Sequence, residues 1–282
     1  MTRHVTSSPL TLSSFSRFIV GRLLKLMGNV FKLMSYPFHW LLPDKRFTLP
    51  AHAAPLIRPR RPCAVPRTLW QTNFTDRVTL PVYLNYLCNR LMAPTFEYRF
   101  VSTRGRSDFI AANYPAEVHR RYSRLRIGAA QADFWRVLVL QACGGVYMDI
   151  DAHLVWPLHR ILGAEREVLF VRSRKGGLSN YFIASRPGTA ELQAVSEAIG
   201  DHIAENRGSG VFDLTGPGVF NRVIDAAMVE SESYRFLCLQ GSFTNERFQY
   251  VDKPEGKWTR EQKAVGVLHR DGDATVKATE KR

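Results

Sequence analysis

The chain has 282 residues, of which 45% are hydrophobic and 23% are charged, and its formal net charge is +14 at pH 7. The hydrophobic and charged fractions exclude a mostly disordered chain, and the length fits one large α/β domain or two small ones. Ten of the fourteen net positive charges lie in the first 70 residues, where eleven Lys and Arg accompany the single acid Asp44. Such a basic segment predicts an anionic partner: phosphate groups, anionic lipid or nucleic acid.

The first predicted element is an amphipathic helix within residues 1–42. Large apolar residues recur there at helical spacing, and Arg22, Lys25 and Lys32 fall on or near the other side. These charges leave no uncharged run near the ~20 residues of a spanning helix, and no small-residue cleavage site follows that would indicate a secretory signal. We therefore expect this segment to lie on an anionic membrane surface. A helix that only packs on the rest of the protein is the alternative.

Residues 43–64 contain five prolines and are predicted to form a linker. Residues 65–270 are predicted to form one domain, and residues 271–282 are polar and predicted to be disordered. Within the domain the patterns predict strands at 65–71, 96–102, 146–151, 167–172 and 181–185, and helices at 75–91, 106–126 with a break near Pro115, 127–143, 189–206 and 217–228. Strands that alternate with helices indicate an α/β sheet.

The four cysteines are far apart in the sequence, at Cys63, Cys88, Cys143 and Cys238. No two of them form a Cys-x-x-Cys pair, so the spacing predicts neither a zinc cage nor a redox motif. Reduced thiols in a cytoplasmic protein are the simplest interpretation, and two disulfides in a secreted protein are the alternative.

Two aspartates, Asp149 and Asp151, end the predicted strand at 146–151. Residues two apart in a strand point to the same face, and two adjacent carboxylates repel each other unless a cation or proton lies between them. Mg²⁺ and Mn²⁺ prefer oxygen ligands and often share them with substrate phosphates. The pair therefore predicts half of a metal–diphosphate site, although a solvated pair of carboxylates remains an alternative.

The helix before this strand carries Asp133 and Arg136, three residues apart and so on one face. Either they only pair with each other, or Asp133 accepts hydrogen bonds from a ribose while Arg136 braces the site or contacts phosphate. Gly144 and Gly145 allow the sharp turn from this helix into the strand that carries the aspartates.

The combined pattern resembles a known family. The run Ala132-Asp133-Phe134-Trp135-Arg136, followed by Leu140 and by Gly144-Gly145-Val146-Tyr147-Met148-Asp149-Ile150-Asp151, is similar to the glycosyltransferase sugar-binding region with the Asp-x-Asp motif. That family includes initiating α-1,6-mannosyltransferases, capsular polysaccharide transferases and relatives of the clostridial glucosylating toxins. The resemblance covers roughly residues 64–225. It departs from the family at Trp70, which occupies the place of the usual His, and at Asn73, which occupies the place of the usual Trp.

The resemblance implies a GT-A type, Rossmann-like nucleotide-sugar-binding domain with a mixed central sheet, preceded here by the amphipathic helix. It implies a metal-dependent, retaining hexosyltransferase that uses a UDP- or GDP-linked donor and Mn²⁺ or Mg²⁺. Asp149, Asp151 and Asn180 would be catalytic, with His269 as a further metal ligand. The donor would contact a larger set of residues: Trp70, Asp133, Arg136, Gly144, Gly145, Tyr147, Thr215 and Gly216. For Trp70, base stacking and a place in the core both stay open.

The acceptor expected from the membrane-facing N-terminus is a glycan, a lipid-linked sugar or a polysaccharide. The same N-terminal segment predicts a location at the cytoplasmic face of a bacterial inner membrane, with the Golgi lumen as the alternative. Three competing functions have weaker support. A phosphatase with an Asp-x-Asp nucleophile would usually have Thr or Val where His153 stands. A nucleic-acid binder lacks a recognisable motif, so we expect no nucleic acid, and a non-catalytic scaffold does not need both aspartates.

Overall fold

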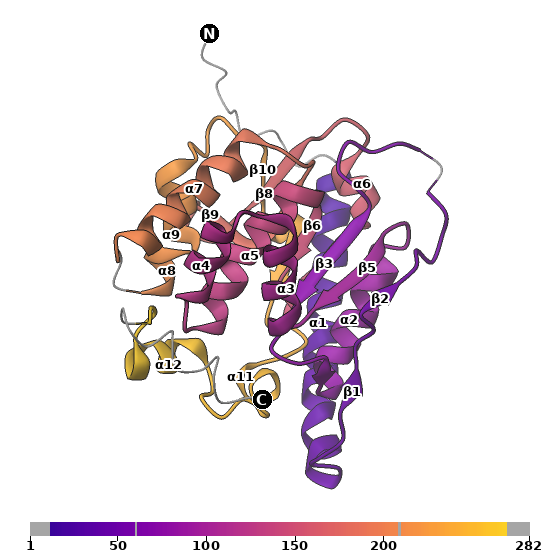
Figure 1. Ribbon diagram of the computed structural model, residues 1–282. Helices are drawn as coiled ribbons and strands as arrows, with labels where there is room; N and C mark the ends of the chain where they lie inside the picture. The colour runs from indigo at the N-terminus through magenta and orange to yellow at the C-terminus, as the bar shows by residue number, and fades with distance from the viewer. Residues whose placement is uncertain (1–11, 60, 208–209, 270–282) are drawn as a thin grey trace.

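The centre of the fold is a seven-stranded mixed sheet with the order β10-β8-β9-β6-β3-β5-β2. The computed structural model describes residues 12–59, 61–207 and 210–269 (Figure 1). The sheet consists of β2 (His52–Ala53), β3 (Thr68–Thr72), β5 (Glu97–Val101), β6 (Gly145–Met148), β8 (Val168–Arg172), β9 (Leu178–Ser185) and β10 (Ser231–Ser233). β6, β3 and β5 run parallel, and β9 is antiparallel to both of its neighbours. The predicted α/β domain with a mixed central sheet is confirmed.

Helices cover both faces of this sheet (Figure 1). Besides α1 (Leu12–Leu41), the helices of the described residues are α2 (Leu80–Met92), α3 (Thr103–Asn113), α4 (Ala116–Ser123), α5 (Gly128–Cys143), α6 (Leu158–Leu162), α7 (Ala190–Ala204), α8 (Val211–Leu214), α9 (Pro217–Val223), α10 (Tyr234–Leu237), α11 (Glu246–Gln249) and α12 (Trp258–Val265). Successive strand residues point to opposite faces, so Leu69 joins the core on the α2 side while Trp70 joins the core on the α5 side. Both faces of the central strands β3 and β6 are therefore buried.

Helix α5 is the central helix on its face of the sheet, because every residue from Ala132 to Leu140 is buried. A helix that is apolar on nearly all sides belongs inside a protein. It ends at Gly144, whose φ of 65° is left-handed, and Gly145 follows with a φ of 107°. A Cβ at Gly144 would lie 2.8 Å from Pro187 Cδ, so this turn into β6 requires glycine.

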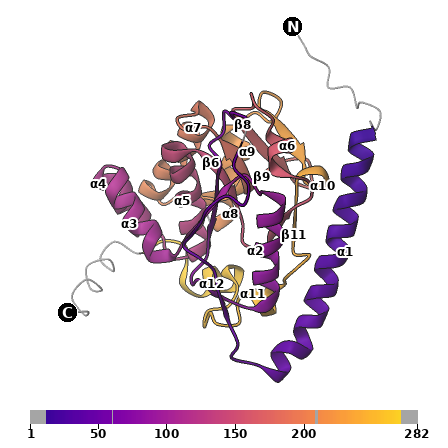
Figure 2. The same cartoon turned by 90° about the vertical axis from the view of Figure 1, so that its right-hand side faces the viewer.

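The predicted N-terminal helix is confirmed as α1 (Leu12–Leu41). It lies along the outside of α2 and α10, at one side of the molecule (Figure 2). Its domain-facing side is marked by Gly21, Gly28 and Ser35, which are buried and seven residues apart. None of the described helices combines the length and the apolar character needed to cross a membrane.

The segment predicted as a linker, residues 43–64, is instead partly built into the domain. β1 (Phe47–Thr48) pairs with β4 (Arg77–Val78), and β2 extends the edge of the central sheet. Leu49 between them is buried at 1% exposure, and the Arg90 guanidinium donates to the Ala54 carbonyl. The prolines suit an edge strand, where a missing N–H is tolerated.

Three further sequence predictions are modified or lie beyond the structure. The strand predicted to include both aspartates ends at Met148, and the helix predicted over 217–228 ends at Val223. The tail predicted to be disordered, residues 271–282, lies outside the described residues. All four cysteines are free thiols.

Candidate functional site

A cavity of about 460 Å³ opens where the parallel strands β3, β5 and β6 end. Ligands of open α/β sheets bind at this carboxyl edge of the strands. Thr72, Thr103 and Asp149 bring residues from the ends of these three strands to the cavity. Aromatic and basic side chains complete much of the wall, including Phe74, Arg106, Arg136, Tyr250, Lys253, Lys257 and Trp258. The volume lies within the range of small-molecule sites.

Asp149 and Asp151 lie in a tight turn between β6 and β7 (Ala152–Leu154), not in a strand as predicted. The turn is closed by the Ala152 N–H, which donates to the Asp149 carbonyl at 3.0 Å. Two buried asparagines of α2 hold it. The Asn85 amide donates to the Ile150 and Ala152 carbonyls at 2.8 and 2.9 Å, and the Asn89 amide also donates to the Ala152 carbonyl at 2.9 Å.

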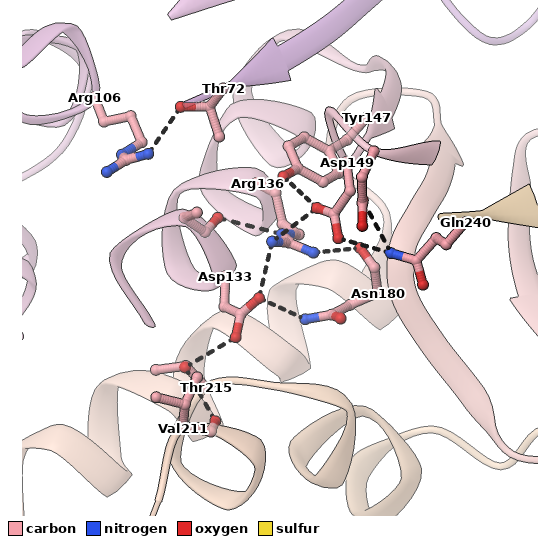
Figure 3. Close-up of polar contacts among 12 residues, drawn as sticks. Thr72, Arg106, Asp133, Arg136, Tyr147, Asp149, Asn180, Val211, Thr215 and Gln240 are labelled. Atoms are coloured by element: carbon pink, nitrogen blue, oxygen red, sulfur yellow. Dashed lines mark hydrogen bonds and ion pairs between the residues drawn. The ribbon is translucent and has the colours of Figure 1, made fainter. Parts of the chain in front are cut away.

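The two carboxylates share one neighbour, the side-chain amide of Gln240 at the end of β11 (Cys238–Gln240). Its Nε2 lies 3.3 Å from Asp149 Oδ2 and 3.4 Å from Asp151 Oδ1; Figure 3 shows Gln240 beside Asp149. Burial, together with the charge of Asp149, raises the pKa of Asp151 to about 7. The carboxylates of Asp149 and Asp151 lie close enough together for the Gln240 amide to contact both, and together they carry excess negative charge. Such a pair of oxygen ligands fits a divalent cation such as Mg²⁺ or Mn²⁺.

Asp133 and Arg136 form a buried network that reaches the first aspartate (Figure 3). Arg136 Nη2 lies 2.9 Å from Asp133 Oδ1 and 3.3 Å from Asp149 Oδ1, and its guanidinium stacks 4.3 Å from the centre of the Tyr147 ring. The Tyr147 hydroxyl donates to Asp149 Oδ1 at 2.8 Å. The predicted pairing of Asp133 with Arg136 is therefore present, and Arg136 in addition neutralises part of the charge of Asp149.

Two residues from later segments complete the surroundings of Asp133. Asn180 Nδ2 donates to Asp133 Oδ1 at 2.9 Å, and the Thr215 hydroxyl lies 3.3 Å from Asp133 Oδ2. Burial, opposed by Arg136, raises the pKa of Asp133 to about 6. Asp133 also lines the cavity.

Several residues assigned to the donor site by resemblance lie elsewhere. Trp70 is 8% exposed, donates from Nε1 to the Gly144 carbonyl at 2.9 Å and packs edge-to-face on Trp135, so it is a core residue. Gly144 and Gly145 lie at the opposite end of β6 from the aspartates, where they make the turn described above. These three residues therefore act on the fold and not on a ligand.

Gly216 and His269 also lie apart from the paired aspartates. Gly216 is the N-cap of α9 and directly precedes Pro217, which lines the cavity. His269 donates its backbone N–H to the Arg124 carbonyl, beside the bridge between Leu125 and Leu268. His269 is not among the described residues that line the cavity. In the described ranges, no cluster of three or more His, Cys, Asp or Glu side chains is arranged to hold a metal.

Four polar residues of the site were not predicted from the sequence: Asn85, Asn89, Arg106 and Gln240. Asn85 and Asn89 are four apart in a helix, so a polar stripe on an otherwise buried helix face could have been noticed. Arg106 is 2% exposed and donates to the hydroxyls of Thr72 and Thr103 at the cavity wall. Gln240 reaches the aspartates only because β11 pairs with β7, a contact between segments about 90 residues apart.

The described residues form a mixed α/β sheet with paired aspartates and a buried Asp–Arg pair at the carboxyl edge of its strands. Residues 81–168 match the family model of the glycosyltransferase sugar-binding region containing the DXD motif. This span includes Asp133, Arg136, Asp149 and Asp151. Residues 81–168 are therefore similar to a glycosyltransferase sugar-binding region.

Two solved structures are similar to the chain at low identity. One is described as the PaToxG glycosyltransferase, with 13% identity, a TM-score of 0.44, and coverage of 74% of this chain and 78% of that chain. Another is the UDP-bound glycosyltransferase domain of the YGT toxin, with 14% identity, a TM-score of 0.36, and coverage of 53% and 54%. No curated protein sequence matches the chain significantly.

Proposed function

We propose that the chain is a metal-dependent glycosyltransferase that moves a hexose from a UDP- or GDP-linked donor to a glycan, glycolipid or polysaccharide acceptor, with retention of configuration. The observation that carries this proposal is the contact network at the cavity, in which Arg136 joins Asp133 to Asp149 of the Asp-x-Asp turn. The match to the DXD sugar-binding region over the same residues supports it.

Each part of the network has a chemical role in this proposal. Asp133, which lines the cavity beside Asn180, accepts hydrogen bonds from the ribose of the donor. Arg136 holds Asp149 in place and adds positive charge next to the diphosphate. Asp149 and Asp151 would hold the divalent cation, which when bound neutralises charge that develops on the departing diphosphate.

In the reaction, the bond between the anomeric carbon and the diphosphate oxygen breaks, and a bond from that carbon to the acceptor oxygen forms. The acceptor hydroxyl approaches from the side of the leaving group and passes its proton to a phosphate oxygen, so the nucleoside diphosphate leaves with that proton. The sugar passes through an oxocarbenium-like state. In this route Asp149 and Asp151 would hold the cation that orients the diphosphate, and no protein nucleophile is required.

The outward face of α1 supports the further proposal that the enzyme works on an anionic membrane surface. This face exposes a continuous apolar stripe, with Leu26, Leu33 and Trp40 exposed by 62%, 69% and 81%. Arg22 and Lys25 are exposed beside it, and α1 has no acidic residue. An apolar stripe next to basic residues suits the boundary between acyl chains and anionic headgroups. The cytoplasmic face of a bacterial inner membrane is the location that we propose.

The activity is tested by comparing Asp151→Asn with Asp108→Asn, an exposed aspartate of α3 whose side chain is 70% exposed. We expect Asp151→Asn to lose Mn²⁺-dependent release of nucleoside diphosphate while its circular dichroism stays unchanged, and Asp108→Asn to behave as the wild type. Full activity of Asp151→Asn would refute the metal-site proposal.

The membrane surface is tested by flotation with vesicles of phosphatidylglycerol and phosphatidylcholine. The double variant Leu23→Glu, Leu26→Glu should lose binding to the vesicles. Each substitution removes roughly 1 kcal/mol of favourable apolar burial in the membrane and adds a negative charge that anionic lipid repels. Met228→Glu is the matched control, since Met228 is 82% exposed and lies outside α1. Unchanged flotation of the double variant would refute this part.

A further inference from the structure

Besides its contacts with α2 and α10, the side of α1 that faces the domain contacts residues 240–250, which we call the 240–250 segment. The segment begins at Gln240, whose amide lies between the two aspartates, and ends at Gln249 and Tyr250, which line the cavity. The described contacts therefore connect an N-terminal helix to both ends of one wall of the candidate site.

Polar and aromatic contacts fix this segment on α1. Lys32 Nζ donates to the Gly241 carbonyl at 2.9 Å, next to Gln240. Further along, Asn245 Nδ2 donates to the Tyr36 hydroxyl at 2.8 Å, and the Tyr36 ring meets Phe248 edge-on at 4.8 Å. The contacts extend over most of the segment, so its position depends on that of the helix.

The tightest contact lies between Gly28 and Phe243. A Cβ placed on Gly28 would lie 2.8, 3.0 and 3.2 Å from three carbon atoms of the Phe243 ring. Phe243 is fully buried and also packs against His153 and Phe31, so its ring has little room to move away. The glycine at this position is needed for helix and segment to approach so closely.

Gly241, which lies two residues before Phe243, contacts the turn that carries the aspartates. The Gly241 N–H donates to the Asp151 carbonyl at 3.1 Å, and the Gln240 amide contacts both carboxylates. Chains of packed and hydrogen-bonded groups of this kind carry energetic coupling between distant positions. Here it runs from Gly28 through Phe243 and Gly241 to the Asp-x-Asp turn.

We propose that α1 is a positioning element of the candidate active site, which acts through the 240–250 segment to hold Gln240 across Asp149 and Asp151. The inference rests on the proposed function in treating this end of the cavity as the metal site. In this arrangement α1 is not a detachable membrane anchor. Its outward face is available to lipid, while its inward face sets the geometry at the two aspartates.

The test compares Gly28→Ala with Gly21→Ala in the full-length protein. Both substitutions replace glycine with a better helix former on the same helix face. At Gly21, however, a Cβ would meet its neighbours at 3.4 Å or more, which is ordinary contact. We expect Gly28→Ala to raise the Kd for Mn²⁺, measured by electron paramagnetic resonance of the free ion, by about fivefold, and Gly21→Ala to change it less than about 1.5-fold.

A second readout does not depend on any ligand. Amide hydrogen exchange of the 240–250 segment should become about threefold or more faster in Gly28→Ala and stay unchanged in Gly21→Ala. Adding Phe243→Leu to Gly28→Ala makes space for the new methyl group and should restore both readouts in part. If Gly28→Ala does not fold, Lys32→Met removes the bond to the Gly241 carbonyl without filling space and should move both readouts in the same direction.

The possible outcomes separate this inference from the proposed function. Wild-type exchange rates and a wild-type Kd for Mn²⁺ in both Gly28→Ala and Lys32→Met would overturn the positioning role. Faster exchange of the segment with an unchanged Kd would also overturn it, because the segment would then move without consequence for the aspartates. A wild-type protein that binds no Mn²⁺ would contradict the proposed function, and the exchange rates would still decide whether α1 holds the segment.

Discussion

The asparagine pair of α2 makes a quantitative prediction about the turn that carries the aspartates. In Asn85→Leu, two donated hydrogen bonds are lost, to the carbonyls of Ile150 and Ala152. The Ala152 carbonyl keeps Asn89 as a donor, whereas the Ile150 carbonyl loses the Asn85 amide. Two hydrogen bonds of about 1 kcal/mol each, plus an unpaired buried carbonyl at about 1–3 kcal/mol, give a cost of roughly 3–5 kcal/mol.

Part of that cost is offset, because Asn85 Oδ1 is itself buried without a hydrogen-bond partner and is removed by the substitution. We therefore expect Asn85→Leu to lower the free energy of unfolding by about 2–3 kcal/mol. In the double variant with Asn89→Leu the Ala152 carbonyl loses both donors, so the loss should exceed the sum of the single variants by about 1 kcal/mol.

The assay is urea unfolding at pH 7.5, followed by circular dichroism. Asn113→Leu is the matched control, because Asn113 donates a single exposed hydrogen bond to the Phe109 carbonyl. It should cost less than about 1 kcal/mol. A loss below about 0.5 kcal/mol for Asn85→Leu, or strict additivity in the double variant, would refute the reasoning that these two amides together hold the turn.

Three further predictions concern single residues. Trp70→Phe should lower stability by about 1–2 kcal/mol, since it leaves the Gly144 carbonyl unpaired, yet change donor affinity less than about twofold; a large loss of affinity by calorimetry would return Trp70 to the binding site. Asp133→Asn should weaken donor binding by about tenfold, and unchanged affinity would mean that Asp133 only pairs with Arg136. Burial lowers the pKa of His153 to about 4, so the unfolded chain binds a proton below about pH 6.5 that the folded chain does not. The wild type should therefore lose about 2 kcal/mol more of its free energy of unfolding than His153→Leu when the pH falls from 7.5 to 5. Urea unfolding at both pH values tests this, and equal losses in the two proteins would contradict it.

Local patterns were enough to predict the helix that carries Asp133 and Arg136, the turn at Gly144 and Gly145, and the pair of aspartates at the site. Asp133 and Arg136 lie three apart in a long apolar helix, so their shared face follows from helical geometry alone. The aspartates follow a short buried strand, and strand ends at one edge of a parallel sheet lie close together. These features depend on neighbours within about 20 residues.

The errors arose where position depends on distant parts of the chain. Trp70 was ambiguous because both faces of β3 are buried, so alternation does not tell a core face from a ligand face. Gly144 and Gly145 could have been excluded from the site, since a strand rises about 3.3 Å per residue and Gly145 is four residues from Asp149. Gln240 could not be predicted, because only the pairing of β11 with β7 brings it to the aspartates.

The measurement that tests the central claim most directly is hydrolysis of UDP-, GDP-, CMP- and dTDP-linked sugars with Mn²⁺, with Mg²⁺ and with a chelator. We predict release of UDP or GDP from one donor, only when metal is present. Hydrolysis that continues in the chelator, or calorimetry in which none of these donors binds in the presence of metal, would contradict a metal-dependent glycosyltransferase.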